Sequence, residues 1–322
     1  MKVFLVGATG AIGQRLVPLL LSGGHRVVAT TSKRSRLDSL RAAGTSPVLV
    51  DALDPKAVMD AVVSTRPDVV VHQATALADV RSFRNFDREF ALTNRLRTEG
   101  TENLLKAAEA AGVRRFVAQS YSGWPSAREG GPVKTEDDPF DPNPPRAMAR
   151  TLDAIRNLET MVTTARKVEG IVLRYGGFYG PGTSLAPGGY AAEMVRDRKF
   201  PIFGNGAGIW SFLHIDDAAR ATVSAIEGTA TGVFNIVDDE PAAVSVWLPE
   251  LARVLGAKPP LHMPAWLGRM VLGEAGMSLM SSVRGSSNAK AKRVLGWHPS
   301  YASWREGFRH ELASESARGK AA

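Results

Sequence analysis

The sequence predicts an α/β protein built on a parallel sheet. Residues 2–21 have the pattern of a buried strand, a glycine turn and an amphipathic helix, with no spare residues between them. Short apolar runs typical of strands recur at residues 26–29, 47–50, 68–72, 115–120 and 171–174. Helical patterns separate several of these runs, at residues 55–64 and 148–165 among others. Such alternation of strand and helix is typical of βαβ units.

The opening strand and turn predict a nucleotide site. The apolar run 3–6 is rich in strand formers, as expected of a strand buried on both faces. Gly7, Gly10 and Gly13 follow at intervals of three, and an apolar helical stripe begins at Leu16. Glycine lets a pyrophosphate approach the backbone, and the new helix directs free N–H groups at the anion. The flanking strands and helix favour a dinucleotide site over a turn without a ligand.

At this point the sequence resembles the extended and atypical short-chain dehydrogenase/reductases, an NAD(P)-dependent epimerase/dehydratase-like superfamily. Its opening pattern V-x-G-A-T-G-x-x-G matches residues 5–13. The resemblance implies a Rossmann-type, doubly wound parallel sheet with a smaller, mainly helical C-terminal substrate lobe. Further segments resemble family patterns, namely 73–76 (H-x-A-A), 94 with 100–105 (N-x-x-G-T-x-N-L-L, here with a longer Asn–Gly gap), 174–182 (R-x-x-x-x-Y-G-P-G), 212–219 (F-x-H-V-D-D-x-A) and 290–297 (K-A-x-x-x-L-G-W).

The resemblance also implies a division of the chain. Residues 1–175, with return segments at about 209–237, are expected to form the cofactor domain. Residues 176–208 and 238–312 are expected to form the substrate lobe, and 313–322 a flexible tail.

NADP(H) is favoured as the cofactor because no carboxylate follows the second strand. An NAD enzyme would usually carry Asp or Glu there to hold the ribose 2′-hydroxyl. Here Thr31 and Ser32 precede Lys33 and Arg34, which can bind a 2′-phosphate. These cations can also be the solvated start of a helix, and NAD(H) stays possible. The resemblance places Asp51 at the adenine.

The resemblance implies cofactor contacts at the carboxyl ends of the strands. The expected cofactor-binding residues are Gly7, Thr9, Gly10, Ala11, Ile12, Gly13, Thr31, Ser32, Lys33, Arg34, Asp51, Ala52, Gln73, Ala74, Thr75, Tyr175, Gly176 and Phe178.

The family's proton-donating Y-x-x-x-K pair is missing. Aligning Glu159 with the family's Y-x-x-x-K-x-x-x-E puts Thr151 in place of the tyrosine and Ile155 in place of the lysine. Tyr121 is the best candidate donor, because it lies at or beside the family's catalytic Ser/Thr position. The expected catalytic group is Tyr121, Ser120, Ser122 and Thr151, with the two serines as hydrogen-bonding neighbours of the phenol. Alternatively, Tyr121 only lines the pocket and the proton comes from water or the substrate.

Trp210 lies where nucleotide-sugar enzymes of the family hold a diphosphate with arginine. An indole cannot neutralise phosphate, but it can cover a flat apolar molecule. The residues expected to line a substrate pocket are Trp124, Tyr179, Trp210, Met263 and Trp266, with Phe178 and Met270 beside them. Packing in the core is the alternative for each.

Composition limits the other functions. The chain of 322 residues is 44% hydrophobic and 22% charged, as in a soluble globular protein. It has no cysteine, and Met1-Lys2 runs directly into the first strand, so we expect a cytoplasmic protein without disulfides. The formal charge of +8 is scattered, so nucleic-acid binding is not expected. Neither a membrane span nor a metal site is expected, and the protein is expected to be a monomer or homodimer.

These observations predict an NADPH-dependent carbonyl reductase that acts on an apolar, possibly polycyclic or aromatic small molecule. The first alternative is an NAD(P)-dependent nucleotide-sugar epimerase or dehydratase. The second is a non-catalytic NADP(H)-binding sensor similar to the NmrA-like regulators.

Overall fold

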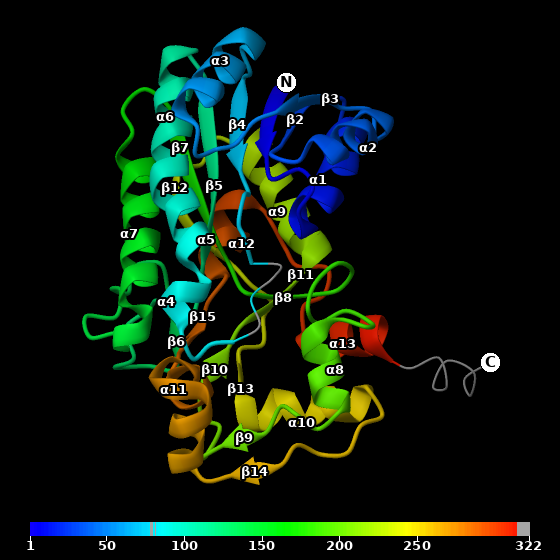
Figure 1. Ribbon diagram of the computed structural model, residues 1–322, viewed down its shortest axis with the longest axis vertical. Helices are drawn as coiled ribbons and strands as arrows, with labels where there is room; N and C mark the ends of the chain where they lie inside the picture. The colour runs from blue at the N-terminus through cyan, green and yellow to red at the C-terminus, as the bar shows by residue number, and fades with distance from the viewer. Residues whose placement is uncertain (78–79, 81, 314–322) are drawn as a thin grey trace, which may run out of the picture.

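A seven-stranded parallel sheet forms the centre of the molecule (Figure 1). The computed structural model describes residues 1–77, 80 and 82–313. The strand order is β12-β7-β5-β4-β1-β2-β3. The strands are β1 (Lys2–Val6), β2 (Arg26–Thr31), β3 (Ser46–Leu49), β4 (Val69–His72), β5 (Arg115–Tyr121), β7 (Glu169–Tyr175) and β12 (Gly232–Ile236).

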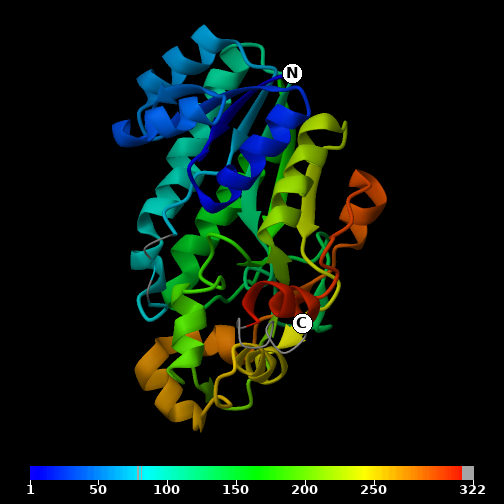
Figure 2. The same ribbon diagram turned by 90° about the vertical axis from the view of Figure 1, so that its right-hand side faces the viewer.

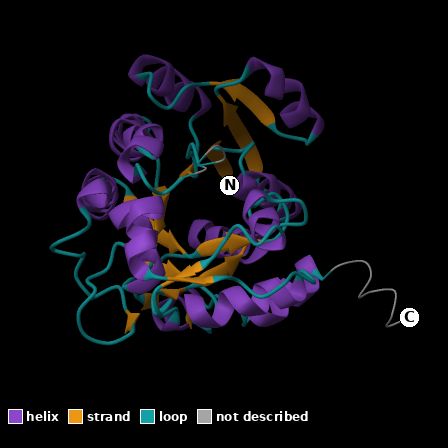
Figure 3. Cartoon of the chain, turned by 60° about the horizontal axis from the view of Figure 1, so that its bottom comes forward, coloured by secondary structure: helices purple, strands orange, loops and turns teal. Residues whose placement is uncertain are grey.

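Helices cover both faces of this sheet (Figures 2 and 3). Val3 and Leu5 face one core, whereas Phe4 and Val6 face the other, because successive strand residues point to opposite faces. The first core includes α1 (Ala11–Ser22), α2 (Leu37–Ala42), α9 (Ile215–Glu227) and α12 (Ala289–Leu295). The second includes α3 (Pro55–Thr65), α6 (Thr101–Ala110) and α7 (Ala149–Thr164). This is the doubly wound arrangement predicted from the sequence.

A helical segment in four parts leads into the second core. It comprises α4 (Phe86–Glu89), α5 (Ala91–Arg95), the π-helical turn η2 (Leu96–Gly100) and α6. Such π turns insert extra residues into a helix and are frequent at functional sites. The turn η2 lies between the predicted Asn94 and Gly100, where the gap is longer than in the family pattern.

A second lobe lies beyond the carboxyl ends of the strands, at the bottom of Figure 1. Its core contains several large aromatic side chains, among them Phe212, Trp247, Trp304 and Phe308. Its helices are α8 (Tyr190–Arg196), α10 (Val244–Val254), α11 (Ala265–Ser281) and α13 (Trp304–Leu312). Its short strands are β8 (Gly177–Tyr179), β9 (Ile202–Phe203), β10 (Ile209–Trp210), β11 (Phe212–His214), β13 (Ala242–Ala243) and β14 (His262–Met263).

Several short elements complete the fold. The strands β6 (Val133–Lys134) and β15 (Gly285–Ser286) pair with each other, and the 3-10 helices η1 (Arg34–Arg36) and η3 (Arg146–Met148) precede α2 and α7. The helix α11 bends at Gly273, whose φ is +69°.

The expected elements differ from those observed by only a few residues. The strand expected at 26–29 continues to Thr31, and the helix expected at 148–165 spans Ala149–Thr164. The expected tail at 314–322 lies outside the described residues. In the part of the chain that the structure describes, no helix combines the length and apolar character needed to cross a membrane.

Candidate active site

The glycine turn between β1 and α1 leaves no room for side chains. Gly7 has a φ of +93°, and a Cβ there would lie 2.7 Å from the backbone carbon of Gln73. A Cβ on Gly13 would lie 2.3 Å from the carbonyl oxygen of Gly7 and 2.5 Å from that of Ala8. No acidic residue occupies the first turn of α1, which begins after Gly10. The turn therefore fits a pyrophosphate at the helix N-terminus.

Three further residues were expected at this turn. The side chain of Ile12 is buried in the core, so only its backbone can face a ligand. Thr9 and Ala11 are partly exposed, and the Thr9 carbonyl accepts a hydrogen bond from the Gln14 amide at 3.0 Å. Their backbone positions agree with a phosphate-binding turn, but no contact with a cofactor is tested.

The end of β2 carries the residues expected at a 2′-phosphate. The Thr31 hydroxyl accepts a hydrogen bond from the Lys33 backbone N–H at 3.1 Å, which shapes the turn. Lys33 and Arg34 are exposed, and neither side chain has an ion pair or hydrogen bond with the rest of the described chain. Ser32 is exposed between them. Two cations and the Ser32 hydroxyl thus remain free for an anion.

The end of β3 carries Asp51 and Ala52. The Asp51 carboxylate accepts a hydrogen bond from the Leu53 N–H at 2.9 Å and is exposed. Ala52 is buried, and its carbonyl accepts a hydrogen bond from the Asn103 side chain at 3.0 Å. Asn103 belongs to the predicted family helix, so this contact joins α6 to the expected adenine site.

A buried hydrogen-bond chain connects the ends of β4 and β7. The Gln73 amide donates to the Tyr175 hydroxyl at 3.1 Å, and that hydroxyl lies 2.7 Å from the Thr222 hydroxyl. Burial raises the pKa of Tyr175 to about 12, so this phenol stays neutral and fastens α9 to the sheet. Phe178 packs against its ring.

Three other residues predicted at this edge of the sheet lie beside the same chain of hydrogen bonds. Ala74 and Thr75 follow Gln73 and are partly buried. Gly176 follows β7, where a Cβ would lie 2.7 Å from the Ser211 carbonyl oxygen. The backbone just after β7 therefore lies close to the backbone between β10 and β11 at this point.

The expected catalytic group at the end of β5 is only partly assembled. The Ser120 hydroxyl donates to Glu159 at 2.6 Å, and Glu159 also holds Arg174 through two hydrogen bonds of 2.6 and 2.9 Å. The Ser120 hydroxyl thus donates to the carboxylate of a buried ion pair, and it makes no hydrogen bond with Tyr121. The Ser122 hydroxyl is buried without a partner among the described residues. Burial raises the pKa of Tyr121 to about 12, against the opposing charge of Arg97.

Thr151 is fully buried at the start of α7. Its hydroxyl donates to the Asp87 carboxylate at 2.6 Å and accepts a hydrogen bond from the Asn94 amide at 2.9 Å. The expected catalytic role is therefore not supported by the geometry, because the only proton of the hydroxyl is already donated to Asp87. Through these hydrogen bonds Thr151 joins α7 to α4 and α5. Ile155 packs in a hydrophobic cluster at this junction.

A buried arginine, Arg97, was missed by the sequence analysis. Counting the family pattern N-x-x-G back from Gly100 places Arg97 where the family has asparagine, and this count was the available signal. Its side chain is 4% exposed, and its Nη1 atom has no hydrogen-bond partner in the described structure. Burial lowers its pKa to about 10, so the guanidinium remains charged at neutral pH. A cation therefore acts electrostatically on Tyr121 although the family lysine is absent.

The expected substrate-lining residues do not form one pocket. Trp124 packs against Phe86 and Tyr121, beside the end of β5. Trp210 is partly buried and donates its indole N–H to the Leu279 carbonyl at 2.9 Å. Trp210 and Tyr121 both pack against the hydrophobic cluster that contains Trp124, so the two tryptophans and the candidate donor lie in one region.

The other expected lining residues lie elsewhere. Tyr179 is fully buried between Phe308 and His214, so it belongs to the core of the second lobe. Met263 is partly buried against the same core. Trp266, like its neighbour Met270, is 63% exposed on α11. The expectation for Tyr179 and Trp266 is corrected, because one faces packed side chains and the other faces solvent.

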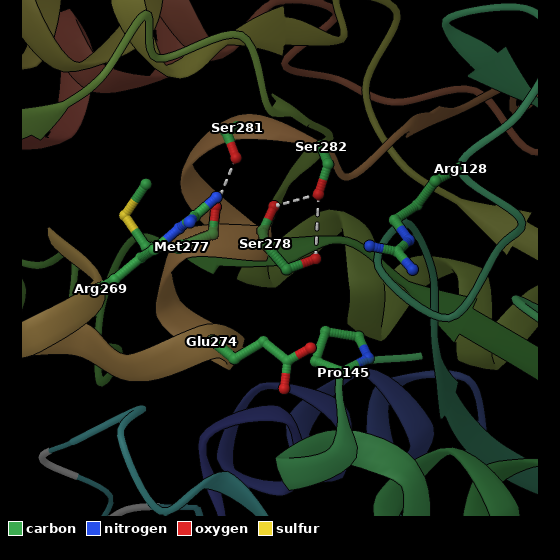
Figure 4. A pocket seen from close by; sticks show the side chains of 8 residues that line it. All are labelled: Arg128, Pro145, Arg269, Glu274, Met277, Ser278, Ser281 and Ser282. Atoms are coloured by element: carbon green, nitrogen blue, oxygen red, sulfur yellow. Dashed lines mark hydrogen bonds between the residues drawn. The ribbon is translucent and has the colours of Figure 1, made fainter. Parts of the chain in front are cut away.

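An open cleft of about 470 Å³ lies where α11 meets the segment before α7. Figure 4 shows Arg128 and Arg269 on opposite sides of this cleft, with serines between them. Arg128 pairs with Asp141 at 2.7 Å, and Glu274 accepts the backbone N–H of Arg146 at 3.2 Å. The cleft is lined by Arg128, Pro145, Arg269, Glu274, Met277, Ser278, Ser281 and Ser282. This polar cleft differs from the aromatic site at Tyr121 and Trp124.

Metal ligation has no support within residues 1–77, 80 and 82–313. These residues include no group of three or more His, Asp or Glu side chains that could hold an ion. His72 is buried, its Nε2 lies 3.0 Å from the Leu96 carbonyl oxygen, and burial lowers its pKa to about 4. The imidazole is therefore neutral and packs at the end of β4.

Comparison with known proteins shows the family. The NAD dependent epimerase/dehydratase family matches residues 3–236, and the chain belongs to this family. It is therefore an oxidoreductase-type enzyme of a superfamily that depends on a nicotinamide dinucleotide.

Two curated relatives are reductases. A 3-diazoavenalumate denitrifying reductase from a Streptomyces species is 45% identical over 312 residues, which cover 97% of this chain and 100% of the relative. A 2-alkyl-3-oxoalkanoate reductase from Stenotrophomonas maltophilia is 27% identical and covers 80% of this chain and 76% of its own length. Among solved structures, the UDP-glucose 4-epimerase of Thermus thermophilus in complex with NAD has a TM-score of 0.71 at 25% identity, over 99% of both chains.

Proposed function

We propose that the protein is an NADPH-dependent reductase of an aromatic small molecule, and that it works without a Tyr/Lys pair. The observation that carries the proposal is the contrast between an intact dinucleotide turn and an altered proton-donor site. Gly7 and Gly13 keep the close backbone approach that a pyrophosphate needs. Thr151 and Ile155 replace the donor pair, and Thr151 is engaged with Asp87.

NADPH is the proposed cofactor because of the residues that follow β2. Lys33 and Arg34 are exposed cations without partners in the described chain, and no carboxylate precedes them on β2. A 2′-phosphate would gain charge-assisted hydrogen bonds from them. When bound, the cofactor supplies the hydride.

An aromatic diazo compound is the first proposed acceptor. The name of the relative that is 45% identical states that it reduces a diazo compound and removes nitrogen. An aryl diazonium ion that accepts a hydride on its terminal nitrogen becomes an aryl diazene. The diazene then loses N₂ while its hydrogen moves to the ring carbon. The charges balance without an added proton, so this reaction does not need a Tyr/Lys pair.

A ketone is the second proposed acceptor, because Tyr121 lies at the end of β5. Carbonyl reduction needs a proton on oxygen as well as a hydride on carbon. The Tyr121 phenol is neutral at physiological pH, since burial raises its pKa to about 12. It can therefore donate this proton, although it is a weak acid.

Epimerase or dehydratase action on a nucleotide sugar is a less favoured alternative. Such a reaction first removes a proton from a sugar hydroxyl, and Thr151 with Ile155 offers no base. The indole of Trp210 also replaces the arginine expected at a diphosphate. A purely sensory role is disfavoured because the similarity to a reductase spans 97% of the chain.

The test measures NADPH oxidation with two acceptor classes. The enzyme is mixed with NADPH and either 4-hydroxybenzenediazonium, labelled with heavy nitrogen at both positions, or an aromatic ketone. We expect labelled N₂ and phenol to form in equal amounts to the NADPH consumed. Reactions without enzyme and with Gly13→Ala control for direct reduction of the diazonium by NADPH. Failure to oxidise NADPH with any member of either class would overturn the proposed function.

A further inference from the structure

The candidate active site contains a buried guanidinium that has no partner among the described residues. Arg97 is 4% exposed, and its side chain makes no ion pair or hydrogen bond with the residues that the structure describes. A buried charge is costly unless another charge or polar groups compensate it. The arrangement is therefore incomplete without a ligand.

The position of Arg97 is set by η2 and the neighbouring strands. The carbonyl of Leu96, the preceding residue, lies 3.0 Å from the Nε2 atom of His72 at the end of β4. The charge of Arg97 also acts on Tyr121 at the end of β5. In a parallel sheet this edge is where ligands bind. Arg97 thus lies at the edge where substrate and nicotinamide are expected to meet.

Among the described residues, the carboxylate that interacts with Arg97 is already engaged. Glu159 interacts with Arg97 only through space, because its oxygens accept two hydrogen bonds from Arg174 and one from Ser120. Tyr121 and His72 are neutral, and neither supplies a negative charge. The Ser122 hydroxyl, also buried and without a partner, is a second unused polar group after β5. The site therefore has an excess positive charge and spare hydrogen-bonding capacity.

We propose that Arg97 binds an anionic oxygen of the substrate, a carboxylate or an ionised phenol, and so selects acidic aromatic molecules. The proposal rests on the proposed function and adds the charge of its substrate. A planar guanidinium can hold a carboxylate with two parallel hydrogen bonds and a phenolate with one. The rings of Tyr121, Trp124 and Phe86 lie close by and can cover the aromatic part. The family lysine, absent at position 155, is thereby replaced by a cation with a different task.

The test compares the binding of charged and neutral probes to the NADP⁺-saturated enzyme. One pair is benzoate and methyl benzoate, and the other is 4-nitrophenolate and 4-nitroanisole at mildly alkaline pH. We expect at least one anion to bind about tenfold more tightly than its neutral partner, as measured by calorimetry. The pair that shows the preference identifies the anionic group as carboxylate or phenolate. Equal binding within both pairs would overturn the proposal.

Variants of Arg97 assign any preference to this side chain. Arg97→Met should abolish the preference, and Arg97→Lys should retain part of it, because an ammonium keeps the charge but not the fork of donors. Arg97→Met should melt at the same or a higher temperature, since it removes an uncompensated buried charge. A preference that survives in Arg97→Met would contradict the proposal.

Two further results separate the proposal from its rivals. A loss of NADP⁺ affinity in Arg97→Lys would show that the cofactor is the ligand of Arg97 and would overturn the proposal. A lowered melting temperature with an unchanged probe preference would show a structural role. These measurements need no turnover, so a protein that reduces no acceptor but prefers the anions would refute the proposed function and leave the anion site intact.

Discussion

The two ends of β5 each have a buried arginine nearby, and the two are held in opposite ways. At the amino end, Arg115 is 0% exposed and donates hydrogen bonds to the carbonyls of Ala225 and Ala230 and to Glu169, at 2.8 to 3.1 Å. At the carboxyl end, Arg97 is almost as buried but has no such partner among the described residues. The same chemical group makes three hydrogen bonds at one end, with only its Nε atom unpartnered, and makes none with the described residues at the other.

This difference separates structural from ligand-directed polar groups. Buried polar groups in folded proteins are nearly always paired, so each unpaired one calls for an explanation. Arg115 joins β5 to β7 and to the end of α9, and its partners explain its burial. The unpaired atoms of Arg97 and Ser122 gather where parallel sheets bind ligands. The amino end of β5 therefore stabilises the fold, and the carboxyl end is prepared for a bound molecule.

Gly13→Ala should have the largest effect, because the added methyl group distorts the turn between β1 and α1 that is expected to bind the pyrophosphate. A Cβ there would lie 2.3 Å from a backbone oxygen that cannot move aside without distorting the turn. We expect NADPH affinity to fall at least about a hundredfold, which is near 3 kcal/mol. Fluorescence titration with NADPH measures this loss.

Gly131→Ala is the matched control for that substitution. A Cβ on Gly131 would have its nearest neighbour at 3.9 Å, and its backbone is not in the left-handed region. This variant should bind NADPH as the wild type does. Tight binding by Gly13→Ala would mean that the cofactor avoids the turn between β1 and α1.

Arg115→Met should come next and should affect stability alone. The variant leaves the carbonyls of Ala225 and Ala230 without their donor, which costs about 2 kcal/mol. Chemical denaturation should show this loss, while the probe preference of the Arg97 site stays unchanged. Arg97→Met provides the converse test, because that variant should change the probe preference without lowering stability. Equal stability losses in both variants would remove the distinction between the two ends of β5.

The sequence predicted the sheet and the glycine turn because both depend on local patterns. Apolar runs and spaced glycines are visible without tertiary structure, and the doubly wound arrangement followed from the family resemblance. The roles of Ser120 and Thr151 could not be predicted, because their partners Glu159 and Asp87 lie on other elements. Arg97 was missed since an arginine in a helix is ordinarily exposed. Only the packing of η2 against the strand ends shows that its charge is buried.

Arg34→Ala tests the outer part of the same ligand edge, with a smaller effect. Arg34 is exposed, so its contact with a 2′-phosphate is screened by solvent. We expect NADPH affinity to fall about tenfold, or 1.4 kcal/mol, with NADH affinity unchanged. Arg41→Ala, which removes an exposed arginine paired with Asp38, should change neither affinity. Equal losses for both cofactors in Arg34→Ala would contradict the 2′-phosphate assignment.

Tyr121→Phe should have the smallest effect if the acceptor carries a diazo group, and it separates the two proposed reactions. Release of N₂ needs no proton donor, so the rate should stay within about threefold, less than 1 kcal/mol of barrier. With a ketone substrate, the rate of the variant should instead fall about a hundredfold, because the phenol must protonate the oxygen.

The pH profile of ketone reduction gives a second measurement. The proton-donating form of Tyr121 is present below its pKa of about 12 and is lost above it, so this group should cause no fall in ketone reduction between about pH 6 and pH 10. A fall near neutral pH that disappears in Tyr121→Phe would mean that the bound cofactor and substrate lower the pKa of the phenol, and that the end of β5 supplies the acid after all.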